Sequence, residues 1–134
     1  MLDPHGALIY TMVIVSAAER DLPDSELQMI GDIIGQLPAF RGFDRKTLPR
    51  MLNDCANSLG REDGLEATLD EINAALPPKL HETAYAIACD LVAADGEASQ
   101  EELRLLELIR HRLNVDRLTA AAIERGARAR FQTL

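Results

Sequence analysis

Residues 93–102 read Ala-Ala-Asp-Gly-Glu-Ala-Ser-Gln-Glu-Glu, and a related stretch, Ala-Ala-Glu-Arg-Asp-Leu-Pro-Asp-Ser-Glu, occupies residues 17–26. A shift of 76 residues aligns the two stretches and also aligns apolar residues that follow them. These matched apolar pairs are Leu27 with Leu103, Ile33 with Ile109, and Leu37 with Leu113. The chain therefore contains an acidic helical hairpin twice, and the acidic turn recurs together with the apolar pattern around it.

Apolar residues return every three or four positions along the chain, and no segment alternates strictly between apolar and polar residues. This period is typical of helices that bury one face, so we predict an all-α fold of about seven helices without strands. The expected helices span residues 4–19, 23–37, 44–59, 65–76, 79–94, 99–113 and 116–130. Their starts are marked by Asp3-Pro4, by Asp44, by a capping box of Ser99 and Glu102, and by Asp116. Pro49 lies near the start of the third helix and predicts an irregular first turn there.

The length of 134 residues suits a single domain that buries one core. We expect this domain to cover residues 1–134, with one repeat at about 4–59, a connecting helix at about 65–76, and a second repeat at about 79–130. Two three-helix units of this kind usually pack about a pseudo-twofold axis, because each covers the apolar face of the other.

The composition is that of a water-soluble globular protein, with 47% apolar residues and a formal net charge of −8. The negative charge argues against non-specific binding of nucleic acid. The longest apolar run, residues 7–18, is shorter than the roughly 20 residues that a membrane-spanning helix needs. We read no signal peptide and expect a cytoplasmic protein.

The acidic turns differ in how well ordinary helix chemistry explains them. Glu26 and Glu102 fall in first helical turns, where the helix dipole and capping favour carboxylates. Glu19 and Asp95 fall at the ends of the preceding helices, where the dipole disfavours an anion. Asp95 can be explained by an Asp-Gly turn, but Arg20 stands in the glycine position of the first copy while the carboxylate is retained.

Carboxylates on either side of a tight helical hairpin can converge on a hard cation. The candidate ligands are Asp95, Glu97 and Glu102 in the second copy, and Glu19, Asp21 and Glu26 in the first. Calcium is the best fit, with magnesium, manganese or zinc as alternatives. An EF-hand is excluded, because Gln100 and Leu106 stand where its loop counted from Asp95 needs Gly and Glu. Any site would be open, hydrated and weak, and a solvated acidic turn without a cation remains the alternative.

The stretch at residues 93–102 resembles the signature of the TerB-like family, the tellurite-resistance TerB proteins of bacteria. Residues 17–27 resemble the N-terminal hairpin of the same family, and the resemblance extends over roughly residues 5–130. It implies a helical, pseudo-twofold domain with acidic clusters at Glu19 and Glu26 and at Asp95 and Glu102. It also implies a role in tellurite resistance or stress response with membrane-associated Ter partners, so the protein could lie at the inner membrane. Related domains occur beside J-domains in co-chaperones. The chain departs from the family pattern at Glu19-Arg20, where Asp-Gly is expected.

The remaining polar residues indicate structural roles rather than catalysis. Cys55 and Cys89 fall in expected helices without partners at zinc-ligand spacing, so we expect buried free thiols. The histidines His5, His81 and His111 are scattered, and each is expected at the surface or partly buried. No nucleophile motif and no phosphate-binding loop are present, and we expect no enzyme.

Two further features leave alternatives open. Asp90 lies among apolar residues, and a buried acid needs a partner. The partner could be an Arg or a helix N-terminus, or Asp90 could contribute an oxygen to a cation site. We favour the structural pairing. Basic residues cluster at 41–50 and 117–130 and could contact an acidic partner or anionic lipid, although a solvated face is the simpler interpretation. A protein–protein interaction module without metal, using its acidic and basic faces, is therefore the alternative function. A homodimer is also compatible with the sequence.

Overall fold

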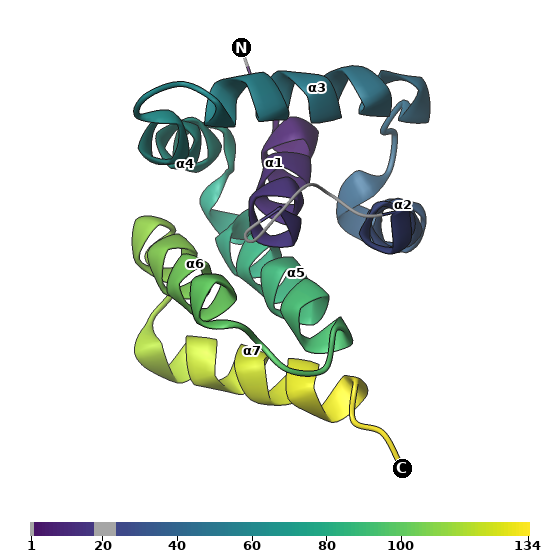
Figure 1. The fold of residues 1–134 in the computed structure, drawn as a ribbon, viewed down its shortest axis with the longest axis vertical. Coiled ribbons are helices and arrows are strands. Elements are labelled where there is room, and N and C mark those ends of the chain that lie inside the picture. Colours follow the sequence, from purple (N-terminus) through teal and green to yellow (C-terminus); the bar gives the residue numbers. More distant parts are fainter. Residues whose placement is uncertain (1, 18–23) are drawn as a thin grey trace.

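A computed structural model describes residues 2–17 and 24–134. In this part of the chain the fold is all-α, as predicted, and contains no strand. The helices are α1 (Pro4–Ser16), α2 (Asp24–Gln36), α3 (Leu48–Leu59), α4 (Gly64–Ala75), α5 (His81–Ala94), α6 (Gln100–Arg112) and α7 (Arg117–Arg130). Short 3-10 helices cover Pro38–Phe40, Arg45–Thr47 and Pro78–Leu80. Figure 1 shows α3 and α7 at opposite ends of the molecule, with α1 and α5 between them.

The predicted N-cap residues lie at helix starts, but one of them caps a different helix from the one predicted. Asp3 caps α1 by accepting a hydrogen bond from the Gly6 N–H at 2.7 Å. Asp44 caps the 3-10 helix Arg45–Thr47 instead of α3, which begins only at Leu48. This shift follows from Pro49, which has no N–H to donate and therefore belongs in a first helical turn.

Helix α1 is the centre of the fold. All of its residues from Gly6 to Ser16 are buried. Such an all-round apolar helix is stable only when neighbours cover every side. Helices α2, α3, α4, α5 and α6 provide this cover. Figure 1 shows α1 running between α3 and α5.

Helix α5 is the second buried helix and carries the C-terminal part of the fold. It packs against α1, α6 and α7. Helices α6 and α7 hardly touch each other, so α5 holds both of them in place. In the N-terminal part, α1 packs with α2 and α3 in a corresponding way. The pseudo-twofold relation of two repeats remains a prediction that this packing supports.

Two histidines separated by the same 76-residue shift occupy corresponding places. His5 lies in the first turn of α1, and its Nε2 is 3.0 Å from the carbonyl oxygen of Ala39, beyond the end of α2. His81 begins α5, and its Nδ1 is 2.9 Å from the carbonyl oxygen of Leu113 at the end of α6. Both histidines are half-buried, as expected, but their corresponding contacts with carbonyl groups beyond α2 and at the end of α6 were not predicted.

Ion pairs between distant segments tie the helices together. Arg112 of α6 reaches α4, where it pairs with Glu66 and with Asp70. Asp90 of α5 pairs with Arg130 at the end of α7, which confirms the structural pairing favoured for this residue. Asp90 is half-buried rather than enclosed in the core, so its charge remains partly hydrated. None of the helices in the described residues is long and apolar enough to cross a membrane.

We expect a cavity in α1 to destabilise the fold strongly. Met12 is 0% exposed, whereas Leu118 on α7 is 82% exposed. Met12→Ala should therefore lower the free energy of unfolding by about 2–5 kcal/mol, because it removes apolar contacts and leaves a void. Leu118→Ala should change it by less than about 0.5 kcal/mol. Urea unfolding followed by circular dichroism measures both, and equal effects would contradict the central place of α1.

Candidate functional site: the acidic turn and the groove beside it

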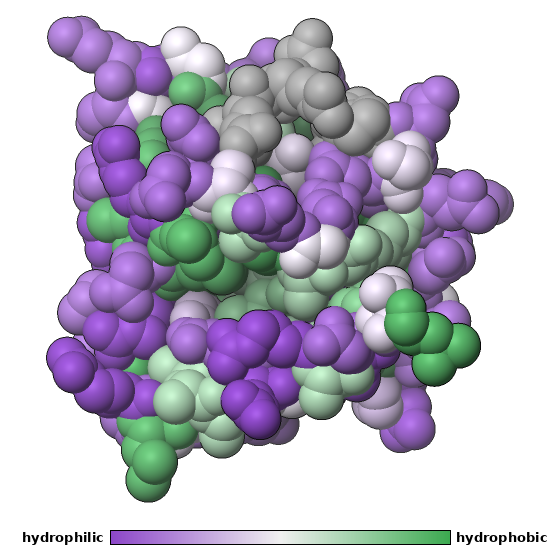
Figure 2. Space-filling model, turned by 60° about the horizontal axis from the view of Figure 1, so that its bottom comes forward, coloured by the Kyte–Doolittle hydropathy of each residue, from purple (hydrophilic) through white to green (hydrophobic). Residues whose placement is uncertain are grey.

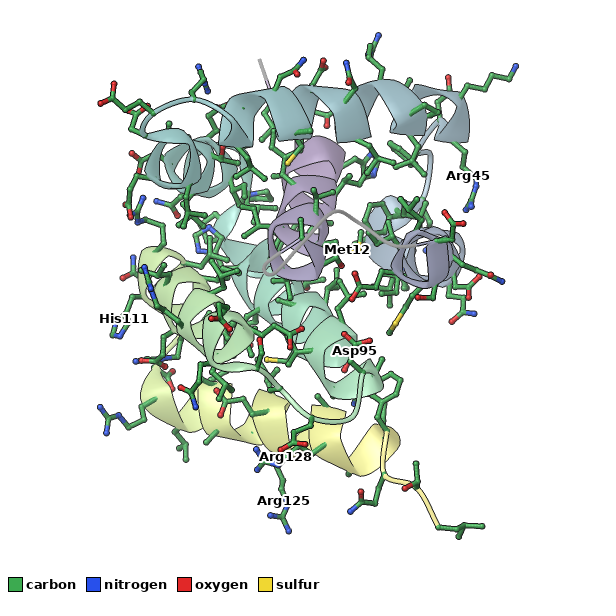
Figure 3. The ribbon with its side chains drawn as sticks, viewed as in Figure 1. Met12, Arg45, Asp95, His111, Arg125 and Arg128 are labelled. Atoms are coloured by element: carbon green, nitrogen blue, oxygen red, sulfur yellow. The ribbon has the colours of Figure 1, made fainter. Side chains whose placement is uncertain are left out.

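The α5–α6 turn is built on a left-handed glycine. Helix α5 ends at Ala94, and Gly96 adopts a φ of +91°. A Cβ added to Gly96 would meet nothing within 4 Å, so the backbone conformation rather than space requires glycine here. The turn leaves Asp95 and Glu97 exposed on either side of this glycine. Figure 3 places Asp95 at the C-terminal end of α5.

The predicted capping box fixes the start of α6. The Ser99 Oγ accepts a hydrogen bond from the Glu102 N–H at 3.1 Å, and Glu102 Oε1 accepts one from the Ser99 N–H at 3.0 Å. Glu102 is half-buried, and one of its carboxylate oxygens is thus committed to helix capping. Ordinary helix chemistry accounts for its position, with or without a cation.

Within the described part of the chain, the carboxylates of the turn have no basic partner in an ion pair. Among the described residues, no Arg, Lys or His forms an ion pair with Asp95, Glu97, Glu101 or Glu102. The acids at either side along the chain are neutralised, because Asp90 pairs with Arg130 and Glu107 with Arg110. The Arg110 hydrogen bond also lowers the pKa of Glu107. The turn therefore concentrates negative charge that no described basic residue compensates.

The predicted cation ligands do not form a finished site. In residues 2–17 and 24–134, no three His, Cys, Asp or Glu side chains are arranged to hold a metal ion. In the first copy, Glu26 lies half-buried in the first turn of α2. Glu19 and Asp21 lie outside the described residues. Cation binding at either turn stays a prediction.

A groove lies beside the acidic turn, where α5 forms the floor between α6 and α7. We call it the α6–α7 groove. Its deep part is a pocket of about 440 Å³. It is lined by Tyr85, Cys89, Val92, Ala93, Gly96, Glu97, Ala98, Leu103, Leu106, Glu107, Glu124, Ala127 and Arg128. The acidic turn thus forms one end of an apolar depression.

Two features of the groove differ from the sequence interpretation. Leu103 was expected on the buried stripe of its helix, but it is 46% exposed at the groove. The reason is that α7 does not pack closely on α6, so the groove between the two helices leaves Leu103 partly open to water. The Tyr85 O–H donates a hydrogen bond of 2.5 Å to Glu124, a pair that the sequence analysis missed. No local motif marks this pair, since its members lie on α5 and α7.

Burial raises the pKa of both cysteine thiols and of the Tyr85 hydroxyl. Cys55 and Cys89 are free and buried, as predicted. Burial raises the pKa of each thiol to about 12. Burial, followed by the hydrogen bond with Glu124, also raises the pKa of Tyr85. Neither thiol is therefore prepared as a thiolate nucleophile at neutral pH.

Loss of the capping box should destabilise α6 at the acidic turn. Ser99→Ala removes the acceptor of the Glu102 N–H bond, and we expect a loss of about 0.5–2 kcal/mol in the free energy of unfolding. Ser25, an exposed serine in the first turn of α2, provides the control substitution. Chemical denaturation of both variants tests this, and a Ser99→Ala protein as stable as wild type would rule out a capping contribution.

Both thiols should be unreactive in the native protein. With a pKa of about 12, only about one thiol in ten thousand is ionised at pH 8. We expect labelling by a thiol reagent such as Ellman's reagent to be slow in buffer and complete in urea. Single Cys55→Ala and Cys89→Ala variants assign the signal, and fast native labelling of either remaining thiol would contradict the burial described here.

Comparison with known proteins gives one match. The family model described as tellurite resistance protein TerB matches residues 5–125, nearly the whole chain, and so confirms the resemblance seen in the sequence. No curated protein and no solved structure gives a match.

Proposed function

Because the chain belongs to the TerB family, we propose that it is a non-enzymatic domain that binds a divalent cation weakly at its acidic turns. It would act through protein partners in tellurite resistance or a related stress response. The second-copy ligands are Asp95, Glu97 and Glu102, and the first-copy ligands are Glu19, Asp21 and Glu26. Calcium is the favoured cation.

The uncompensated charge of the α5–α6 turn is the observation that carries this proposal. Asp95 and Glu97 are exposed, and the described residues provide no basic partner for either. Exposed carboxylates that are free of ion pairs can rotate toward a cation and share it with water. A cation would also relieve the repulsion between acids held together at one turn.

The proposal of a non-enzymatic role rests on the state of the reactive groups. The Cys89 thiol and the Tyr85 hydroxyl border the groove, and burial raises the pKa of both. A general acid or base that works near neutral pH needs a pKa near 7 instead. Binding is therefore the chemistry that this face supports best.

We expect calcium to raise the melting temperature of the protein. A cation present at 100 times its dissociation constant stabilises a folded protein by about 2.7 kcal/mol. Asp95→Asn combined with Glu102→Gln should abolish this effect, while Gln at position 102 can still accept the capping hydrogen bond. Thermal melts in EDTA and with calcium, magnesium, manganese or zinc compare the cations.

The matched control for this experiment is Glu62→Gln combined with Asp63→Asn. Both residues are exposed acids at the α3–α4 turn, so the control changes net charge equally. A control that responds to calcium like wild type assigns the effect to the α5–α6 turn. If none of the four cations stabilises the wild-type protein, the cation proposal is wrong.

A second candidate, an interaction module without metal, is favoured by the exposed basic residues of α7. Arg125 and Arg128 are exposed, and Figure 3 shows both extending away from the helical body. Among the described residues, neither forms an ion pair with an acid. Unpaired arginines of this kind can bind carboxylates of a partner.

Charge reversal separates this candidate from the first. If an acidic partner binds α7, then Arg125→Glu combined with Arg128→Glu should abolish its co-purification, because two attractions become repulsions. Arg41→Glu combined with Arg50→Glu, at exposed positions in the N-terminal half, is the matched control. If wild type and the α7 variant recover the same amounts of partner proteins, Arg125 and Arg128 do not form the binding surface.

A further inference from the structure

The α6–α7 groove is longer than its deep pocket. A second, more polar pocket of about 330 Å³ lies between the two helices and is lined by Glu107, Arg110, Arg117, Ala120, Ala121 and Glu124. It shares Glu107 and Glu124 with the deep pocket. The two pockets form one elongated depression, which exists because α6 and α7 pack on α5 but hardly on each other.

At the deep part of the groove, Leu103 presents apolar surface to water. Val92, Leu106 and Ala127 form buried apolar walls. Leu103 stands at the groove with 46% of its surface exposed. On the side of the molecule turned forward in Figure 2, apolar surface is flanked by hydrophilic side chains. Covering such surface is favourable by about 25 cal/mol for each Å² removed from water.

The two edges of the groove carry opposite charges. Glu97 lies on the α6 side and Arg128 on the α7 side, and both are exposed. Neither has an ion-pair partner within the described part of the chain. The other acids of the groove are occupied, since Glu124 accepts the Tyr85 hydrogen bond and Glu107 pairs with Arg110 and His111. Among the described residues, the available charges are therefore Glu97 on the α6 side and Arg117 and Arg128 on the α7 side.

A groove that is apolar in its deep part, polar in its continuation and charged at its edges is complementary to an amphipathic helix, which places apolar side chains in the deep part and polar side chains along the edges. We propose that the α6–α7 groove docks an amphipathic helix of a partner protein. The helix inserts a large apolar side chain beside Leu103, places a basic side chain next to Glu97, and places an acidic side chain next to Arg128. This interaction shares Glu97 with the cation site proposed for the turn, so a bound cation would compete with the basic side chain of the helix.

The test uses a designed, fluorescein-labelled amphipathic peptide with a leucine stripe, lysines along one flank and glutamates along the other. Its binding is followed by fluorescence polarisation in EDTA, so that no cation contributes. We expect saturable binding that Leu103→Ser weakens at least about tenfold, as for a central apolar anchor. Leu118→Ser is the matched control, because Leu118 is 82% exposed on α7 and does not line either pocket of the groove.

Amide chemical shifts of the wild-type protein locate the peptide without any substitution. We expect the shifted resonances to concentrate at the deep pocket. Thermal melts of Leu103→Ser should match wild type, since a half-exposed leucine contributes little to the core. Shifts spread over other faces, or equal affinity of wild type and Leu103→Ser, would overturn the proposal.

Charge exchange tests the edge contacts. Glu97→Lys should lower the affinity for the peptide severalfold, because a lysine of the peptide then faces a lysine of the protein. A peptide with glutamates in place of its lysines should bind this variant with the affinity that the original peptide has for wild type. Absence of saturable binding by the designed peptide overturns the proposal. So does self-association of the protein that Leu103→Ser abolishes, because the groove would then bind a second copy of the chain. Peptide binding without cation stabilisation leaves this inference intact and removes only the cation proposal.

Discussion

Burial of α1 on all sides is the constraint from which the rest of the fold follows. A helix without a polar face cannot lie at the surface, so neighbours from both halves of the chain must enclose it. The N-terminal α3 and α4 and the C-terminal α5 and α6 all do so. Helix α5 then provides the base for α6 and α7, and the acidic turn and the groove lie on this second layer. The core thus positions the acidic turn and provides the floor of the groove beside it.

The distribution of ion pairs separates structural acids from acids available for binding. Asp90, Glu66 and Asp70 neutralise arginines on other helices and hold elements together. Asp95 and Glu97 contribute nothing comparable, and they raise the local negative potential at the turn. Repulsion between acids held at one turn is a cost to the folded protein unless another charge offsets it. A cation or a basic side chain of a partner would each do so.

The helices could be predicted from the sequence because their signals are local. The apolar period, the Asp3 cap and the capping box of Ser99 and Glu102 each act within a few residues, and the structure bears them out. The exposure of Leu103 and the Tyr85–Glu124 bond could not be predicted, because both depend on how far α6 and α7 lie apart. The acidic turn itself was identified, but periodicity and capping say nothing about whether its carboxylates converge. That depends on side-chain conformations and on an external cation.

The enclosure of α1 also bears on how such a chain could have arisen. A unit of α1 to α3 alone would leave in water the side of α1 that α5 now covers. A second such unit would have to cover it, so the isolated unit would be stable only as a dimer at sufficient concentration. Joining two units through α4 turns this association into an intramolecular contact with a high effective concentration. If the two predicted repeats arose by duplication and fusion, this step would have freed the fold from dependence on protein abundance and allowed the two halves to diverge.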